Sequence, residues 1–260
     1  MPTKALLLAA TLLLIACEKP IVADEEEGTE GNQASLMVSV IELEETPFFD
    51  TTRSTPADAC THLNFAVYDG SGTRVKQINQ RVGDSRFGTA SFQLAEGTYQ
   101  LVVVAHSSAK NPTMTNPAKI QFTNAAGFSD TFLHQEQVVV TAQSEHLTLS
   151  LKRIVSLCRF VITDEYPQDV VRMRFYYTGG SGAFDANTGL GCVKSKQSVI
   201  FDVTTGRKQF DLYTFLHEKE SVIHLLVTAY DAADNVLLER DYDIPMLQYN
   251  VTQYTAPFFH

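Results

Sequence analysis

Apolar and polar side chains alternate with a period of two from Leu36 to the end of the chain, in short runs separated by Gly, Asp, Asn and Pro. This period is typical of β-strands with one buried face, and no stretch keeps the 3.6-residue period of a long amphipathic helix. The strand-like runs of the first half are 36–41, 63–68, 74–78, 91–94, 101–104, 138–140 and 147–151. Those of the second half are 158–162, 171–177, 198–203, 210–213, 222–227 and 236–240. The pattern therefore predicts an all-β protein.

The length of the chain and the two sets of runs predict how it is divided. Many short strands with polar turns are typical of antiparallel β-sandwiches, and 260 residues suffice for two domains of ordinary size. We expect two tandem sandwiches, residues 35–152 and 153–260, that meet near Arg153. Two irregular segments, 107–132 and the glycine-rich 178–183, are expected to be exposed loops, the second of them a mobile turn.

The first residues have the layout of a secretory signal: Lys4, an apolar run that ends at Ala16, and then Cys17. The apolar run is too short to span a bilayer, which takes about 20 residues. The segment Leu14-Ile15-Ala16-Cys17 resembles the bacterial lipobox. This resemblance implies that residues 1–16 are removed by cleavage between Ala16 and Cys17, and that Cys17 carries acyl chains that anchor the protein in a membrane. An ordinary signal peptide with a chance cysteine at its end is the alternative.

Within residues 17–34, the stretch 24–32 is free of apolar side chains and begins with the acidic run Asp24-Glu25-Glu26-Glu27. Such a segment cannot bury enough surface to fold, so we expect a solvated tether between the lipid and the first sandwich. It also resembles the acidic export signal of surface lipoproteins in Bacteroidetes. That resemblance implies a place on the outer face of the outer membrane.

Charge and cysteine spacing exclude several functions. The net charge is −10 and no basic cluster occurs, which argues against nucleic acid as a partner. With Cys17 assigned to the lipid, Cys60, Cys158 and Cys192 can form at most one disulfide, and the sequence does not say which pair forms it. Neither CxxC nor HExxH spacing is present, so we expect no metal and no cofactor.

Two further patterns bear on catalysis and on sugar binding. The segment Gly179-Gly180-Ser181-Gly182-Ala183 differs by one residue from the nucleophile-elbow pattern G-x-S-x-G, because Ala183 takes the place of the last glycine. The elbow also requires a helix after the serine, and no helix is expected there. We therefore do not expect an enzyme. The chain also has no Trp, the side chain best suited to stack on sugar rings. This argues against the alternative function, a surface glycan-binding lipoprotein of a nutrient-uptake system.

Several short segments resemble the Bacteroidetes fimbrial subunit family, which includes the major and minor fimbrial anchors. In the second half the resembling segments are 149–155, 210–216 and 244–259, and in the first half they are 60–65 and 94–99. The Ala256-Pro257 pair departs from the family's ending, where a glycine is expected. The resemblance implies two transthyretin-like Greek-key sandwiches, other fimbrial subunits as partners, and assembly by donated strands.

The resemblance also suggests which residues serve assembly. The C-terminal segment is rich in β-formers, and the candidate donor residues are Gln248, Tyr249, Val251, Thr252 and Tyr254. Alternatively, this segment closes the second sandwich. Arg53 is a possible protease site, but cleavage there would separate the sandwiches from the lipid on Cys17. The sequence thus predicts a lipid-anchored base subunit that keeps its first strand, 36–41, accepts no partner in its first sandwich, and donates its last strand.

Overall fold

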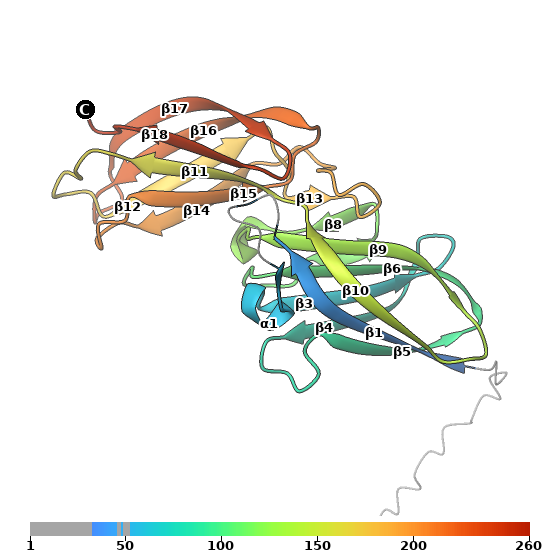
Figure 1. Ribbon diagram of the computed structural model, residues 1–260. Helices are drawn as coiled ribbons and strands as arrows, with labels where there is room; N and C mark the ends of the chain where they lie inside the picture. Colours follow the sequence, from blue (N-terminus) through green and yellow to red (C-terminus); the bar gives the residue numbers. More distant parts are fainter. Residues whose placement is uncertain (1–32, 46–47, 49–52) are drawn as a thin grey trace, which may run out of the picture. The chain divides into compact units, whose positions relative to one another are not determined.

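The computed structural model of the protein describes residues 33–45, 48 and 53–260 (Figure 1). Helix in this part of the chain is limited to α1 (Pro56–Ala59) and the short 3-10 helix η1 (Asn124–Ala126). The strands up to residue 153 are β1 (Gln33–Glu44), β2 (Arg53–Ser54), β3 (His62–Tyr68), β4 (Arg74–Arg81), β5 (Thr89–Ala95), β6 (Gly97–His106), β7 (Thr113–Asn116), β8 (Lys119–Gln121), β9 (Thr131–Val140) and β10 (Glu145–Arg153). The later strands are β11 (Ser156–Ile162), β12 (Arg172–Thr178), β13 (Ala183–Phe184), β14 (Gln197–Asp202), β15 (Gln209–Thr214), β16 (Glu220–Tyr230), β17 (Val236–Leu247) and β18 (Val251–Ala256).

The predicted all-β sandwich fold is confirmed. None of the described helices is long and apolar enough to cross a membrane.

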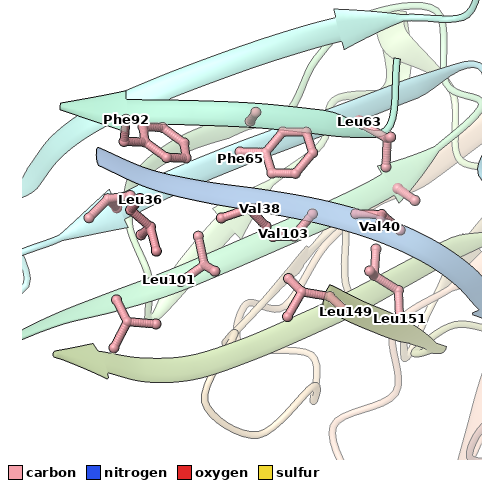
Figure 2. Packing of buried hydrophobic residues seen from close by; sticks show 14 of the residues in the cluster. Leu36, Val38, Val40, Leu63, Phe65, Phe92, Leu101, Val103, Leu149 and Leu151 are labelled. Carbon is pink, nitrogen blue, oxygen red and sulfur yellow. The ribbon is translucent and has the colours of Figure 1, made fainter. Parts of the chain in front are cut away.

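The first sandwich is built from one sheet that folds back on itself. Its strands follow the order β2-β1-β10-β9-β6-β3-β4, and β5 pairs with the part of β1 that β2 leaves free. β10 pairs with β9 at Lys152 and Arg153, so the sheet turns a corner there and lays β5-β1-β10 over β4-β3-β6-β9. Figure 2 shows the core between these layers, where Leu36 and Val38 of β1 lie near Phe65 of β3.

The second sandwich consists of two separate sheets with an aromatic core. The order is β15-β11-β18 in the smaller sheet and β14-β12-β16-β17 in the larger one. Between them, the ring of Phe175 lies 5.6 Å from that of Phe160 and 4.6 Å from that of Phe210, measured between centroids. These separations are typical of favourable aromatic pairs and fix the spacing of the layers.

The two sandwiches share one topology. β1 lies between antiparallel β5 and parallel β10, and β11 lies in the same way between antiparallel β15 and parallel β18. In both cases the first strand of the sandwich is the middle strand of the smaller layer, and the last strand lies beside it. The chain must therefore complete each sandwich before its first strand has both neighbours.

The expectation of two exposed loops was only partly right. Segment 107–132 contains β7, β8 and η1, and the side chains of Met114 and Ile120 are buried. β8 pairs with β13 of the other irregular segment, and this sheet joins the two halves of the chain. The glycines of 178–183 serve close packing and not mobility, since a Cβ at Gly180 would lie 2.0 Å from Thr214 Oγ1.

Candidate assembly site: the first and last strands

β1 is held on both sides and along most of its length. Residues Leu36 to Glu44 pair in parallel with β10, interrupted by a bulge after Val40, and residues Gln33 to Ser39 pair antiparallel with β5. The side chains of Leu36 and Val38 are fully buried and point into the core (Figure 2). β1 is thus both a central strand of its layer and a large contributor to the core.

The residues predicted at the N-terminal end lie at the limit of what the structure describes. Ala16, Cys17 and the tether as far as residue 32 lie outside the described residues, so the lipid and the signal cleavage stay predictions. Arg53 begins β2, and its backbone pairs with Glu44 at the end of β1. The side chain of Arg53 is not described, and cleavage there also stays a prediction.

The C-terminal segment closes the second sandwich in this structure, which is the alternative that the sequence left open. Val251, Thr252 and Tyr254 pair in parallel with Leu157, Cys158 and Phe160 of β11. Donation of this segment to a partner stays a prediction.

The two candidate donor residues that precede β18 fix its entry. The backbone N–H of Gln248 donates to the carbonyl of Lys219 at 2.8 Å. The N–H of Tyr249 donates to Ser156 Oγ at 2.9 Å, with Tyr249 itself in the left-handed region at φ 57°. β18 therefore begins from a strained but hydrogen-bonded turn.

The end of the chain is held by Asp164, a residue that the sequence did not single out. Its carboxylate accepts hydrogen bonds from the backbone N–H groups of Phe258, Phe259 and His260, at 2.9, 2.6 and 3.1 Å. Partial burial disfavours the charged carboxylate, but the N–H donors outweigh it and hold the pKa of Asp164 below its ordinary value. Asp164 follows β11 directly, so the strand that pairs with β18 also places the group that holds the chain end.

The sandwiches meet through a third apolar cluster and backbone hydrogen bonds. The cluster joins Phe122 and Ile120 of the first half to Phe184 and Phe215 of the second, and the N–H of Phe122 donates to the carbonyl of Gly182 at 2.9 Å. Within the first sandwich, Arg153 Nε donates to Asp130 Oδ1 at 2.7 Å, and burial raises the pKa of Asp130 although Arg153 opposes this. Residues 32–260 form one compact unit. The junction is therefore packed and hydrogen-bonded.

A comparison with known protein families identifies the family of the chain. The profile of the family described as fimbrillin-A associated anchor proteins Mfa1 and Mfa2 matches residues 50–257. The chain belongs to this family. The matched region includes every strand of both sandwiches except β1, which lies N-terminal to it. No curated protein sequence matches the chain.

Two solved structures, from Bacteroides ovatus and Bacteroides thetaiotaomicron, show the same fold at low sequence identity. A candidate adhesin from Bacteroides ovatus gives a TM-score of 0.54 at 14% identity and covers 89% of this chain and 88% of its own. A candidate polysaccharide-binding protein from Bacteroides thetaiotaomicron gives 0.50 at 11% identity and covers 79% of each chain. The fimbrial anchor protein Mfa2 from Porphyromonas gingivalis gives 0.44 at 12% identity and covers 80% of this chain and 82% of its own. At these identities the first two likenesses show the fold and no more, and the third supports no conclusion.

In this member of the anchor family, the three cysteines of the sandwiches are free. Cys60 and Cys158 are buried, and burial raises the pKa of each thiol to about 12, which makes both unreactive. Cys192 is exposed. The open question of which pair is bridged is thereby answered: none of the three is paired.

Ser181, the serine of the near-elbow, has a structural role. Its side chain is fully buried, and its Oγ donates to the carbonyl of Ala183 at 2.5 Å. The same oxygen accepts from the N–H of Ala183 and of Val193. Neither a histidine nor a carboxylate is among these partners, so nothing here activates the hydroxyl as a nucleophile. Within residues 33–45, 48 and 53–260, no group of three or more His, Cys, Asp or Glu side chains is arranged to hold a metal ion.

Proposed function

We propose that the protein is the lipid-anchored base subunit of a fimbrium, held in the outer membrane through Cys17 and joined to the next subunit by its C-terminal strand. The observation that carries this proposal is the place of β1. This strand begins at Gln33, so it includes the last two residues of the predicted tether, and it is the middle strand of its layer. A lipid on Cys17 would therefore be covalently continuous with the core of the first sandwich.

The burial of β1 supports its retention. Its large buried side chains are Leu36, Val38, Val40 and Leu43. Burying one Val or Leu side chain stabilises a protein by about 1.5–3 kcal/mol, which gives roughly 6–12 kcal/mol for the four. This is as large as the whole net stability of an ordinary domain, about 5–15 kcal/mol. The first sandwich therefore needs β1, or another strand in its place, to stay folded.

A cut after Arg53 would have two consequences. It would leave β1 and the tether joined to the rest of the protein by non-covalent contacts alone, and loss of β1 would take the lipid with it. A subunit whose task is to hold a fimbrium on the membrane must avoid this. We infer that β1 stays in place and that the first sandwich accepts no partner strand.

The aromatic side chains of the described residues give no support to the glycan-binding alternative. Every described Phe and Tyr is at least half-buried, and none is among the exposed large apolar side chains. A flat aromatic platform for a sugar ring needs an exposed face. A glycan array with the purified protein would separate this alternative from the fimbrial proposal.

Two measurements on cells test the anchor. Cys17→Ala is expected to release the protein from the membrane fraction, whereas Cys192→Ala, which removes an exposed cysteine elsewhere, should leave it there. Mass spectrometry of the protein recovered from cell envelopes should find an acylated Cys17 in the same chain as the sandwiches. A mature N-terminus at Ser54 would instead make the protein a stalk or tip subunit.

A further inference from the structure

β18 is less deeply buried than β10, the strand that closes the first sandwich. None of its six side chains is fully buried: Val251, Thr252, Tyr254 and Ala256 are half-buried, and Gln253 and Thr255 are exposed. β11 is the strand with which β18 forms a ladder, and β18 is the outer strand of this sheet. Beyond one row of backbone hydrogen bonds, the strand is retained by Tyr254, whose ring stacks on Phe160 at 5.4 Å and lies 5.2 Å from the ring of Tyr242, and by Val251, which packs against the cluster between the sandwiches.

The residues after β18 are held much more firmly. Phe258 is fully buried in the core of the second sandwich, and its ring lies 4.9 Å from that of Phe259. The carboxylate of Asp164 binds the N–H groups of both residues and of His260. Hydrogen bonds to an ionised acceptor are stronger than neutral ones. The fixed point of the C-terminal segment is thus its end.

The turn that carries Asp164 is itself tied to its surroundings. The N–H of Thr163 donates to the carbonyl of Ala256 at 3.1 Å, and the ring of Tyr166 lies edge-on to Phe259 at 5.4 Å. Lys208 donates to the carbonyl of Asp164, and its Nζ lies 5.0 Å from the centre of the Tyr166 ring. A single turn between β11 and β12 therefore holds the end of the chain in register with β11.

We propose that Asp164 is a latch that governs the release of β18, so that the donation of this strand, which rests on the function proposed above, is controlled at the end of the chain. While the carboxylate holds residues 258–260, Phe258 stays in the core and the edge of β11 is covered. Once these hydrogen bonds are lost, Phe258 can leave and the strand, none of whose own side chains is fully buried, can follow. The edge of β11 is then open to an extended segment with the same side-chain pattern.

The latch is tested by strand exchange on the purified protein. The probe is a fluorescent peptide with the sequence of residues 248–260, because this segment matches the β11 edge. Its incorporation is measured by anisotropy on the wild-type protein and on two variants. Asp164→Ala loses the acceptor, whereas Glu165→Ala, the matched control, removes the neighbouring, exposed carboxylate, which contacts Lys208 and not the chain end.

The latch predicts incorporation about tenfold faster in Asp164→Ala than in the wild type, the effect of losing charge-assisted hydrogen bonds, and no change in Glu165→Ala. If Asp164→Ala is no faster than the wild type, or if both variants are equally faster, the latch is wrong. Should Asp164→Ala not fold, Asp164→Asn keeps the shape and removes the charge. The same faster rate is then required of it, and a wild-type rate would overturn the proposal.

This experiment needs neither the lipid nor a partner subunit. A failure of the latch would leave the acylation of Cys17 and the N-terminus of the envelope form untouched. Loss of the anchor, shown by a mature N-terminus at Ser54, would in turn leave the exchange rates unchanged.

Discussion

β10 and β18 occupy the same place in the two sandwiches but are retained in different ways. Each is the last strand of its sandwich and runs parallel to the first. β10 continues round the corner to pair with β9, and it buries Leu149, Leu151 and Arg153. β18 pairs with β11 alone, buries none of its side chains fully, and depends on Phe258 and Asp164 beyond its end. One topology thus gives a deeply buried last strand in the first sandwich and, under the proposed latch, an exchangeable one in the second.

The comparison bears on the two different tasks that are proposed for the two ends of the chain. The first sandwich surrounds β1 with paired strands and a full core, which is what an attachment point under load requires. The second sandwich holds its last strand by hydrogen bonds before and after it, by the ring of Tyr254 and by the buried Phe258, and no side chain of the strand itself is fully buried. Under the proposed latch, loss of the hydrogen bonds to Asp164 would free the strand, which would suit a segment that joins a neighbour.

The largest expected effect tests the first sandwich. Leu36→Ala should lower the free energy of unfolding by about 2–5 kcal/mol, because the side chain is fully buried and the core cannot collapse onto the gap. Ile162→Ala in β11, whose side chain lies in the core of the second sandwich, should have a similar cost, since Ile162 is buried as well. Urea unfolding of both variants measures this. A cost below about 1 kcal/mol for Leu36→Ala would mean that β1 is not essential to the core.

A smaller effect separates the two closing strands. Leu149→Ala in β10 should cost about 2–4 kcal/mol, whereas Val251→Ala in β18 should cost less than about 1 kcal/mol, because Val251 is only half-buried. The same unfolding experiment gives both values. Equal costs would remove the contrast between a fixed and an exchangeable strand.

Acid should act more strongly on the first sandwich, because its buried histidines have no counterpart among the described residues of the second. Burial lowers the pKa of His106 to about 3, and His62, stacked on it at 4.9 Å, adds to the shift. Ser108 N–H donates to Nδ1 of His106, so the neutral ring carries its proton on Nε2 and donates it to Asn64.

Between pH 6.5 and 3, the unfolded chain binds a proton at His106 that the folded protein does not. The contribution of His106 to the free energy of unfolding is therefore complete above pH 6.5. It falls by about 2 kcal/mol by pH 5. His106→Gln should flatten the curve of stability against pH in this range, as measured by urea unfolding at each pH. If the variant keeps the wild-type slope, another group causes the acid sensitivity.

The sequence predicted the strands well where burial is local. In the run 36–41 the side chains of Leu36, Val38 and Val40 alternate with polar or exposed ones, and all three are buried. The same run could not show the bulge after Val40, which lets β1 continue to Glu44. A bulge inserts an extra residue relative to one partner strand, and a strict alternation of apolar and polar residues does not reveal where this happens.

Features that depend on distant contacts escaped prediction. Met114 and Ile120 are separated by Asn116-Pro117 and gave no period, yet both are buried in the cluster between the two sandwiches. Asp164 looks like any polar residue after a strand, because the N–H groups that it binds lie 94 to 96 residues further along the chain. For the same reason, cysteine spacing could not say that Cys60 and Cys158 stay unpaired.

Other expectations stay predictions. Asn32–His260 is one compact unit, and the division into domains at residues 152 and 153 is not tested by it. Acylation of Cys17 and cleavage at Arg53 are carried out by other enzymes. Whether they occur depends on whether these enzymes reach the two sites.

Hydrogen exchange on the native protein tests the contrast between the two closing strands most directly. Amide protons that are protected only by the ladder between β11 and β18 should exchange through an opening of the C-terminal segment. Amide protons in the ladder between β1 and β10 should exchange only through unfolding of the first sandwich. We expect the free energy of opening to be at least about 2 kcal/mol lower for β18 than for β10. Equal protection of the two strands would contradict it.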